Sequence, residues 1–165
     1  MGRALIDELC VDYDLLCLRY RRPLADPRVR EVIGDLSQPD LGLAPDELRR
    51  LGGQVDLVIH SGAMTKWNAA EEAVASVNVD GARSIAAFAE RAKAPLYHMS
   101  TAFVARAGEQ GGAGGGPAAY IASKVEAERV VRESRTGSVI LRPSVITGDS
   151  REDRKSTRLN SSHER

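Results

Sequence analysis

The 165-residue sequence predicts an α/β fold built on a parallel, doubly wound sheet. Short apolar runs, which are typical of buried strands, alternate with longer stretches whose apolar residues recur at helical spacing. Small or polar residues follow the strand candidates, as expected where parallel strands end at a ligand-binding edge. The length suits one hydrophobic core, and no apolar run is long enough to span a bilayer.

The first half of the chain contains two helix candidates and three strand candidates. Pro45 and Gly52 bound the second helix, in accord with the preference of proline for a first turn and of glycine for an end. In chain order the elements are a helix over residues 1–10, strands over 15–18 and 28–33, a helix over 45–51 and a strand over 55–60.

The second half continues the alternation. Pro95 stops a long helical stretch, and Pro117 opens the next helix. In chain order the elements are a helix over about 71–93, a strand over 96–100, a glycine-rich loop over 108–116, a helix that begins at 117 and a strand over 138–142.

Several small and polar residues come directly after these strands. In doubly wound sheets, ligands bind outside the carboxyl ends of the strands. We therefore expect the strand ends to converge on one crevice. The residues concerned are Asp35, Ser61, Gly62, Ala63, Ser100, Thr101, Pro143 and Ser144.

Tyr120 and Lys124 lie four residues apart on a predicted helix, so their side chains project from one face. A nearby cation favours the phenolate and brings the pKa of a tyrosine towards neutrality, where it can exchange a proton with a carbonyl or an alcohol. Ser100 and Thr101 can hold the same oxygen. Taken alone, the pattern also fits a surface tyrosine beside a solvated lysine.

The composition favours a small-molecule partner. Acidic and basic residues balance at 23 each, which gives no electrostatic reason to expect nucleic acid or an anionic membrane surface. Cys10 and Cys17 lack the spacing of metal ligands, so we expect reduced thiols and no metal site. The first ten residues lack the continuous apolar core of a secretory signal, and a cytoplasmic location is the simplest expectation.

Six segments in order resemble the extended branch of the short-chain dehydrogenase/reductase family, which includes the NAD-dependent epimerases and dehydratases. The resemblance runs from Gly2 to about Arg151 and implies a Rossmann-type sheet. Trp67 and residues 141–150 are most similar to the thioester reductase and fatty acyl-CoA reductase group. The six segments are residues 34–36, 58–63, 78–81, 100–101, 120–124 and 142–143.

The resemblance implies roles for the residues that match the family's catalytic positions. Thr101 matches the catalytic hydroxyl, with Ser100 as the alternative. Tyr120 matches the acid/base, and Lys124 matches the cation that lowers the pKa of Tyr120 and binds the ribose hydroxyls.

The same resemblance implies a set of cofactor-binding residues. Asp35 would accept a hydrogen bond from the adenine amino group, and Leu36 would pack on the ring. Asn78 would position the active-site strand. The others lie where the backbone would pass close to the cofactor, with Ser61, Gly62 and Ala63 beneath the ribose and pyrophosphate and Pro143 and Ser144 beside the nicotinamide.

Charge after the second strand of such folds indicates the cofactor. An acidic residue there holds the 2′-hydroxyl of NAD, whereas arginine accommodates the 2′-phosphate of NADP. Arg19 and Arg21 follow the strand here, and guanidinium groups bind phosphate through paired hydrogen bonds, so NADPH is favoured over NAD. The alternative is a solvated basic turn.

Both ends depart from the family pattern. The family opens with a strand and a Gly-x-x-Gly-x-x-Gly loop that holds the pyrophosphate, of which only the last glycine is matched, by Gly2. We expect residues 1–151 to form a truncated NAD(P)-binding domain without its first strand, with poor dinucleotide binding and no activity as it stands. Residues 152–165 resemble a translated sequencing adapter, which predicts a non-native or disordered tail.

The function predicted from the sequence is NADPH-dependent reduction of a thioester or another acyl or carbonyl substrate. A nucleotide-sugar epimerase or dehydratase of the same branch is one alternative, and a non-catalytic dinucleotide-binding protein is another. His60 and His98 lie on predicted buried strands and receive no role. The substrate and the oligomeric state stay open.

Overall fold

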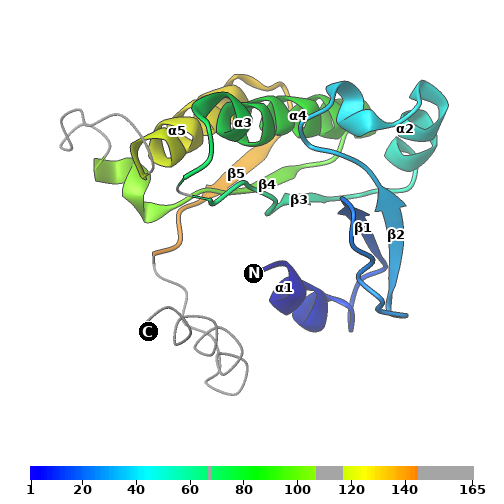
Figure 1. Ribbon diagram of the computed structural model, residues 1–165. Helices are drawn as coiled ribbons and strands as arrows, with labels where there is room; N and C mark the ends of the chain where they lie inside the picture. Colours follow the sequence, from blue (N-terminus) through cyan, green and yellow to red (C-terminus); the bar gives the residue numbers. More distant parts are fainter. Residues whose placement is uncertain (67, 107–116, 145–165) are drawn as a thin grey trace, which may run out of the picture.

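Parallel strands and helices alternate along the chain, as the sequence predicts (Figure 1). The structure is a computed structural model, and it describes residues 1–66, 68–106 and 117–144. The helices are α1 (Gly2–Leu9), α2 (Pro45–Gly52), α3 (Glu71–Ala75), α4 (Gly81–Ala92) and α5 (Pro117–Glu133). The strands are β1 (Leu15–Arg19), β2 (Val29–Ile33), β3 (Val58–His60), β4 (Leu96–Met99) and β5 (Ser138–Leu141).

The strands form two parallel sheets. One contains β1 and β2, and the other has the order β3-β4-β5. Among the described residues no strand pairs β1 with β3. The fold is thus the predicted α/β type, with its sheet divided in two.

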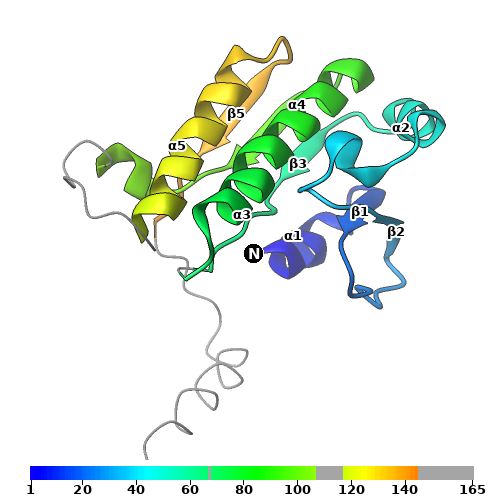
Figure 2. The same ribbon diagram turned by 45° about the horizontal axis from the view of Figure 1, so that its top comes forward.

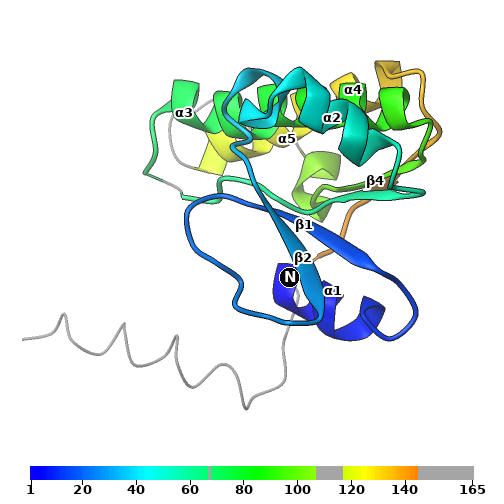
Figure 3. The same ribbon diagram turned by 90° about the vertical axis from the view of Figure 1, so that its right-hand side faces the viewer.

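Helices cover one face of the three-stranded sheet. In Figures 1 and 2, α4 and α5 run side by side over β3, β4 and β5, with α2 beyond α4. The helix α1 lies on the other side, together with β1 and β2, as Figure 3 shows from the side. The carboxyl end of β4 lies beside the first half of α5.

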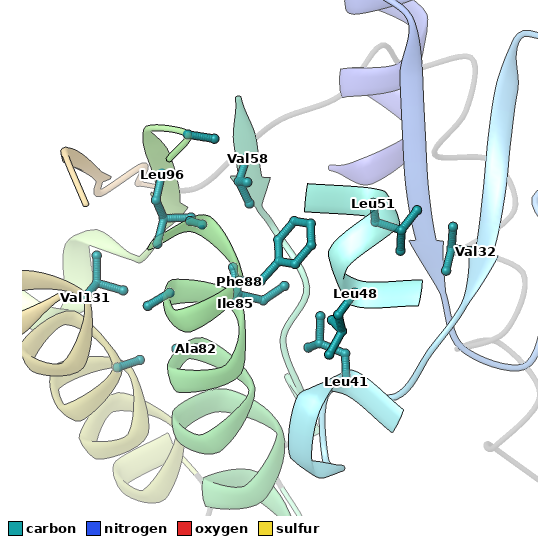
Figure 4. Packing of buried hydrophobic residues seen from close by; sticks show 14 residues of the cluster. Val32, Leu41, Leu48, Leu51, Val58, Ala82, Ile85, Phe88, Leu96 and Val131 are labelled. Carbon is teal, nitrogen blue, oxygen red and sulfur yellow. The ribbon is translucent and has the colours of Figure 1, made fainter. Parts of the chain in front are cut away.

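The hydrophobic core joins the two sheets. Phe88 of α4 lies between Val58 of β3 and the apolar face of α2, which contributes Leu48 and Leu51 (Figure 4). Val32 of β2 belongs to the same cluster. Each such side chain stabilises the fold by about 1.5–3 kcal/mol when it is fully buried. The two sheets are therefore held together by side-chain packing where strand pairing is absent.

The predicted helix over 71–93 forms as one run with an irregular middle. A π-helical segment, η2 (Ser76–Asp80), separates α3 from α4. Single π turns of this kind are frequent at functional sites, and this one carries the buried Asn78. The run ends at Lys93, whose left-handed φ of 56° precedes Pro95.

Two features differ from the sequence prediction. The strand expected over 55–60 begins only at Val58. Its partner β4 is short, and the Val58 N–H bonds the carbonyl of Pro95, the residue just before β4. Two 3₁₀ turns, η1 (Pro39–Gly42) and η3 (Ala102–Arg106), were not predicted. Both follow a strand end and contribute to the edge where ligands are expected.

Candidate active site

Tyr120 and Lys124 lie on the first half of α5, as the sequence predicts. The Lys124 side chain is buried, with 3% of the residue exposed. Its Nζ donates a hydrogen bond of 2.6 Å to the carbonyl of Met99, the last residue of β4. This contact fixes the catalytic candidates of α5 against the carboxyl end of the central strand.

Burial dominates the protonation of this pair. It raises the pKa of Tyr120 above its ordinary value and lowers the pKa of Lys124 to about 8. The expected lowering of the pKa of Tyr120 by the cation is therefore not seen in this structure. The physical reason is that both groups are withdrawn from water, while the ammonium is directed at the Met99 carbonyl.

The two hydroxyl candidates come directly after β4. Ser100 and Thr101 are both buried. The Ser100 N–H bonds the carbonyl of Leu141 at 2.7 Å, and the Ala102 N–H bonds that of Pro143 at 2.9 Å. Backbone hydrogen bonding between these two segments thus continues beyond β4 and β5, and it brings Ser100 and Thr101 beside Pro143 and Ser144.

Asn78 links the loop after β3 to α5. Its Oδ1 accepts from the Met64 N–H at 2.7 Å, and its Nδ2 donates to the Met64 carbonyl at 3.1 Å. The same Nδ2 donates to Ser123 Oγ at 2.9 Å, and that hydroxyl donates to the Tyr120 carbonyl at 2.7 Å. A buried amide therefore positions the turn of α5 that carries Tyr120.

Sequence reasoning missed Ser123 and Met64 as partners of Asn78. The serine directly precedes Lys124, so its position inside the Tyr-x-x-x-Lys pattern was a usable signal. The backbone of Met64 carried no such signal, because any residue type offers the same N–H and carbonyl.

A second group of candidates lies at the ends of β1 and β2. An open cavity of about 480 Å³ brings together Arg19, Arg21 and Asp35, which were predicted separately. Asp35 Oδ1 accepts hydrogen bonds from the N–H and hydroxyl of Ser37, which lower the pKa of Asp35, and the charge of Arg21 adds to this effect. The full lining is Arg19, Tyr20, Arg21, Ile33, Gly34, Asp35, Gln38 and Gly42.

The two arginines of this cavity differ in their contacts. Arg19 Nε donates to Glu31 at 3.1 Å, and its Nη1 donates to two backbone carbonyls. The Arg21 guanidinium lies 4.7 Å from the centre of the Tyr20 ring, and within the described ranges no carboxylate pairs with it. Arg21 is the better placed of the two to bind an added phosphate.

Leu36 is packed against glycines. A Cβ at Gly62 would lie 2.8 Å from Leu36 Cδ1, and a Cβ at Gly81 would lie 3.0 Å from Leu36 Cβ. The small residues predicted near a cofactor thus also make room for Leu36 in the core. Ser61 and Ala63 flank Gly62 and are half-buried.

The predicted strand-end residues do not line a single cavity. Those of β1 and β2 line the cavity described above, whereas Thr101, Tyr120 and Lys124 lie at the second sheet. Gly2 begins α1, and a Cβ at this position would point into open space. The residues present fit the adenosine end of a dinucleotide, through Asp35 and Arg21, and its reactive end, through Tyr120. The division of the sheet separates these two parts.

His60 and His98 form a buried pair between the site and the core. Their rings lie 5.1 Å apart. Burial lowers the pKa of His60 to about 3 and that of His98 to about 4, so both are neutral at pH 7.

Some expectations fall outside the described residues. These are the contribution of Trp67, the glycine-rich loop over 108–116 and the tail over 152–165. Over the part of the chain that is described, no cluster of three potential metal ligands occurs, and no helix is long and apolar enough to cross a membrane.

Several known proteins are similar to this chain in sequence. A family model described as male sterility protein matches residues 3–161. A polyketide synthase–nonribosomal peptide synthetase of Pyricularia oryzae is 32% identical over 145 residues, which are 77% of this chain and 4% of the synthetase. A carboxylic acid reductase of Segniliparus rugosus is 33% identical over 106 residues, which are 63% of this chain and 9% of the reductase.

A solved structure supports the same relationship. The terminal R domain of the myxalamid polyketide synthase–nonribosomal peptide synthetase pathway is 31% identical, with a TM-score of 0.77. The alignment covers 90% of this chain and 47% of that domain. The chain thus spans less than half of the solved domain and a small part of the two curated relatives.

Proposed function

We propose that the protein reduces a thioester with NADPH, because this chain belongs to the male sterility protein family, the thioester-reductase type of extended short-chain dehydrogenase/reductases. Members of this family contain a reductase-type NAD(P)-binding domain, and this chain is one. The observation that carries this proposal is the buried Lys124, which lies on the same helix face as Tyr120. Its hydrogen bond to Met99 fixes it to the end of β4, two residues before Thr101.

The chemistry divides between cofactor and protein. When bound, NADPH supplies a hydride to a carbonyl carbon. The Tyr120 and Thr101 hydroxyls would hydrogen-bond the carbonyl oxygen and stabilise the charge that develops on it. Burial keeps the Tyr120 phenol protonated, which is the form that a proton donor needs in the direction of reduction. Lys124 would supply the positive charge beside this oxygen.

The substrate class rests on the relatives. The similar proteins include a terminal R domain of a polyketide synthase–nonribosomal peptide synthetase pathway and a carboxylic acid reductase, and the second name indicates reduction of a carboxyl group. For a thioester, hydride addition to the carbonyl carbon and departure of the thiolate would give an aldehyde as the first product.

We place the enzyme in the cytoplasm, in keeping with its two free cysteines.

The cavity after β1 supports a preference for NADPH. Arg21 stacks on Tyr20 and faces the same cavity as Asp35, where the adenosine end would lie. A guanidinium there suits the 2′-phosphate. NADPH should accordingly be consumed faster than NADH by the intact protein.

The test is Tyr120→Phe in the intact protein, assayed by NADPH oxidation with an acyl thioester. Removal of the phenol hydroxyl should lower kcat by roughly 10²–10⁴-fold, the usual contribution of general acid catalysis, with little change in NADPH affinity. Tyr13→Phe, at an exposed tyrosine far from α5 in the chain, is the matched control and should keep full activity.

The outcomes separate the candidate functions. Undiminished turnover in Tyr120→Phe would refute the catalytic role of Tyr120. A cofactor that is bound and recycled without net consumption would favour an epimerase or dehydratase. Binding of NADPH without turnover of any carbonyl compound would favour a non-catalytic protein.

A further inference from the structure

A buried carboxylate lies directly behind the candidate active site. Glu128 is on α5, one turn after Lys124 and two turns after Tyr120, so the three side chains share one face of the helix. Glu128 has 0% of its surface exposed. A carboxylate in such a position is rare unless it is paired, and the catalytic proposal makes no use of it.

Two arginines hold Glu128 in its charged form. Arg142, just after β5, donates from Nε to Oε1 at 2.8 Å and from Nη2 to Oε2 at 2.6 Å, which is a bidentate pairing. Arg132, one turn further along α5, donates to Oε2 as well. Burial alone would raise the pKa of Glu128, but these hydrogen bonds outweigh it and hold the pKa well below its ordinary value.

The arginines reach solvent while the carboxylate does not. An open cavity of about 410 Å³ beside β5 is lined by Arg132, Ser138, Ile140 and Arg142. The positive charges on this side are therefore partly hydrated. The negative charge of Glu128 stays inside, where its field towards Lys124 is weakly screened.

Lys124 has few other groups that can stabilise its charge. Its hydrogen bond goes to the neutral carbonyl of Met99. The titratable groups that approach it from β3 and β4 are His60 and His98, which are neutral at pH 7. Tyr120 on the same helix is protonated. Glu128 is thus the negative charge nearest to Lys124 among the described groups that act on it.

We propose that Glu128 is a positioning residue that keeps Lys124 an ammonium in this buried site, and that Arg142 and Arg132 act through Glu128 by keeping it ionised. An ammonium that leaves water for one carbonyl partner tends to lose its proton. A carboxylate one helical turn away, about 5–6 Å between Cβ atoms, opposes this loss. The catalytic consequence rests on the function proposed above, whereas the effect on the charge of Lys124 does not.

The direct test measures the charge of Lys124 without any assay of activity. The chain has only four lysines, Lys66, Lys93, Lys124 and Lys155, so a chain labelled with ¹³C at the lysine Cε gives four NMR signals. Lys124→Arg identifies the signal of interest. Glu128→Gln should move the titration midpoint of Lys124 down by about one pH unit or more, because burial then acts without compensation.

Glu126→Gln is the matched control on the same helix. Glu126 pairs with Arg129 on the exposed face, so its neutralisation should leave the midpoint of Lys124 in place. If Glu128→Gln does not fold, Glu128→Gln combined with Arg142→Gln replaces the bidentate ion pair by two amides and leaves only the more exposed Arg132 without its carboxylate. A Lys124 midpoint equal to that of the unaltered chain in the folded variant would overturn the proposal.

A second readout connects the charge to catalysis. In the intact protein, Glu128→Gln should move the alkaline limb of the kcat profile to lower pH by the same amount as the NMR midpoint, because turnover needs the ammonium. A shifted NMR midpoint with an unshifted rate profile would keep the role of Glu128 and contradict the proposed function of Lys124. An unshifted NMR midpoint would contradict the role of Glu128 itself.

Discussion

Tyr120 and Lys124 show how far sequence spacing determines a site. Their separation by four residues predicts a shared helix face, and α5 provides it. The spacing does not reveal that Lys124 bonds the Met99 carbonyl, 25 residues earlier in the chain. Contacts of this length depend on how α5 packs on β4, and a local pattern contains no information on that packing.

Asn78 is the residue whose loss should disturb the site without touching the chemistry. Asn78→Ala would leave the half-buried Met64 N–H and the buried Ser123 hydroxyl without one partner each, at a cost of about 1–3 kcal/mol per group in the free energy of unfolding. Urea denaturation measures this loss. Asn68→Ala, at an exposed position, is the control and should change the midpoint little. Equal stability of the two variants would contradict the linking role of Asn78.

At the scale of elements, the order of helices and strands was predictable and the sheet pairing was not. Each of the five strands and the main helices appears where apolar periodicity placed it, within a few residues. The π turn at Asn78 was not predicted. The partners of its side chain, Met64 and Ser123, lie 14 and 45 residues away in the chain, beyond the reach of a local pattern. The turns η1 and η3 were not predicted either.

The pairing of β3 with β4 predicts acid sensitivity. It places His60 opposite His98 in the core, where both are neutral. Because burial lowers the pKa of each histidine in the folded state, the unfolded state binds more protons below about pH 6.5. Their contribution to stability is complete above that pH and is lost as the pH falls towards 4, by about 2 kcal/mol per histidine at pH 5.

Urea midpoints at pH 7.5 and pH 5 measure this effect. His98→Phe removes one titrating group and leaves no hydrogen bond broken, since neither ring nitrogen of His98 has a partner among the described residues. The pH dependence of this variant should be about half that of the unaltered chain. A pH dependence that survives unchanged would locate the acid sensitivity elsewhere.

At the scale of the whole molecule, the sheet is divided and the cofactor-binding candidates are divided with it. Asp35 and Arg21 lie at the end of one sheet, and Thr101, Tyr120 and Lys124 lie at the other. Their convergence on one crevice could be inferred from the sequence only for an undivided sheet. Among the described residues no strand joins the two sheets, and the two groups of candidates share no cavity.

The isolated 165-residue chain should therefore bind NADPH weakly. Most of the glycine-rich loop that would hold the pyrophosphate is not matched in this sequence, and the two groups of candidates share no cavity. Isothermal titration should give a Kd above about 1 mM, which corresponds to a binding free energy of no more than about 4 kcal/mol. Micromolar binding would show that the crevice is complete without a further strand.

The divided sheet also affects how the chain behaves at high concentration. Among the described strands, β1 and β3 each pair on one side only, and the other side presents unpaired backbone N–H and carbonyl groups. Nearby apolar side chains such as Leu18 and Ile59 are partly exposed. Edges of this kind are templates on which a strand from another copy can add, so the gap between the two sheets is also where aggregation of the isolated chain would begin.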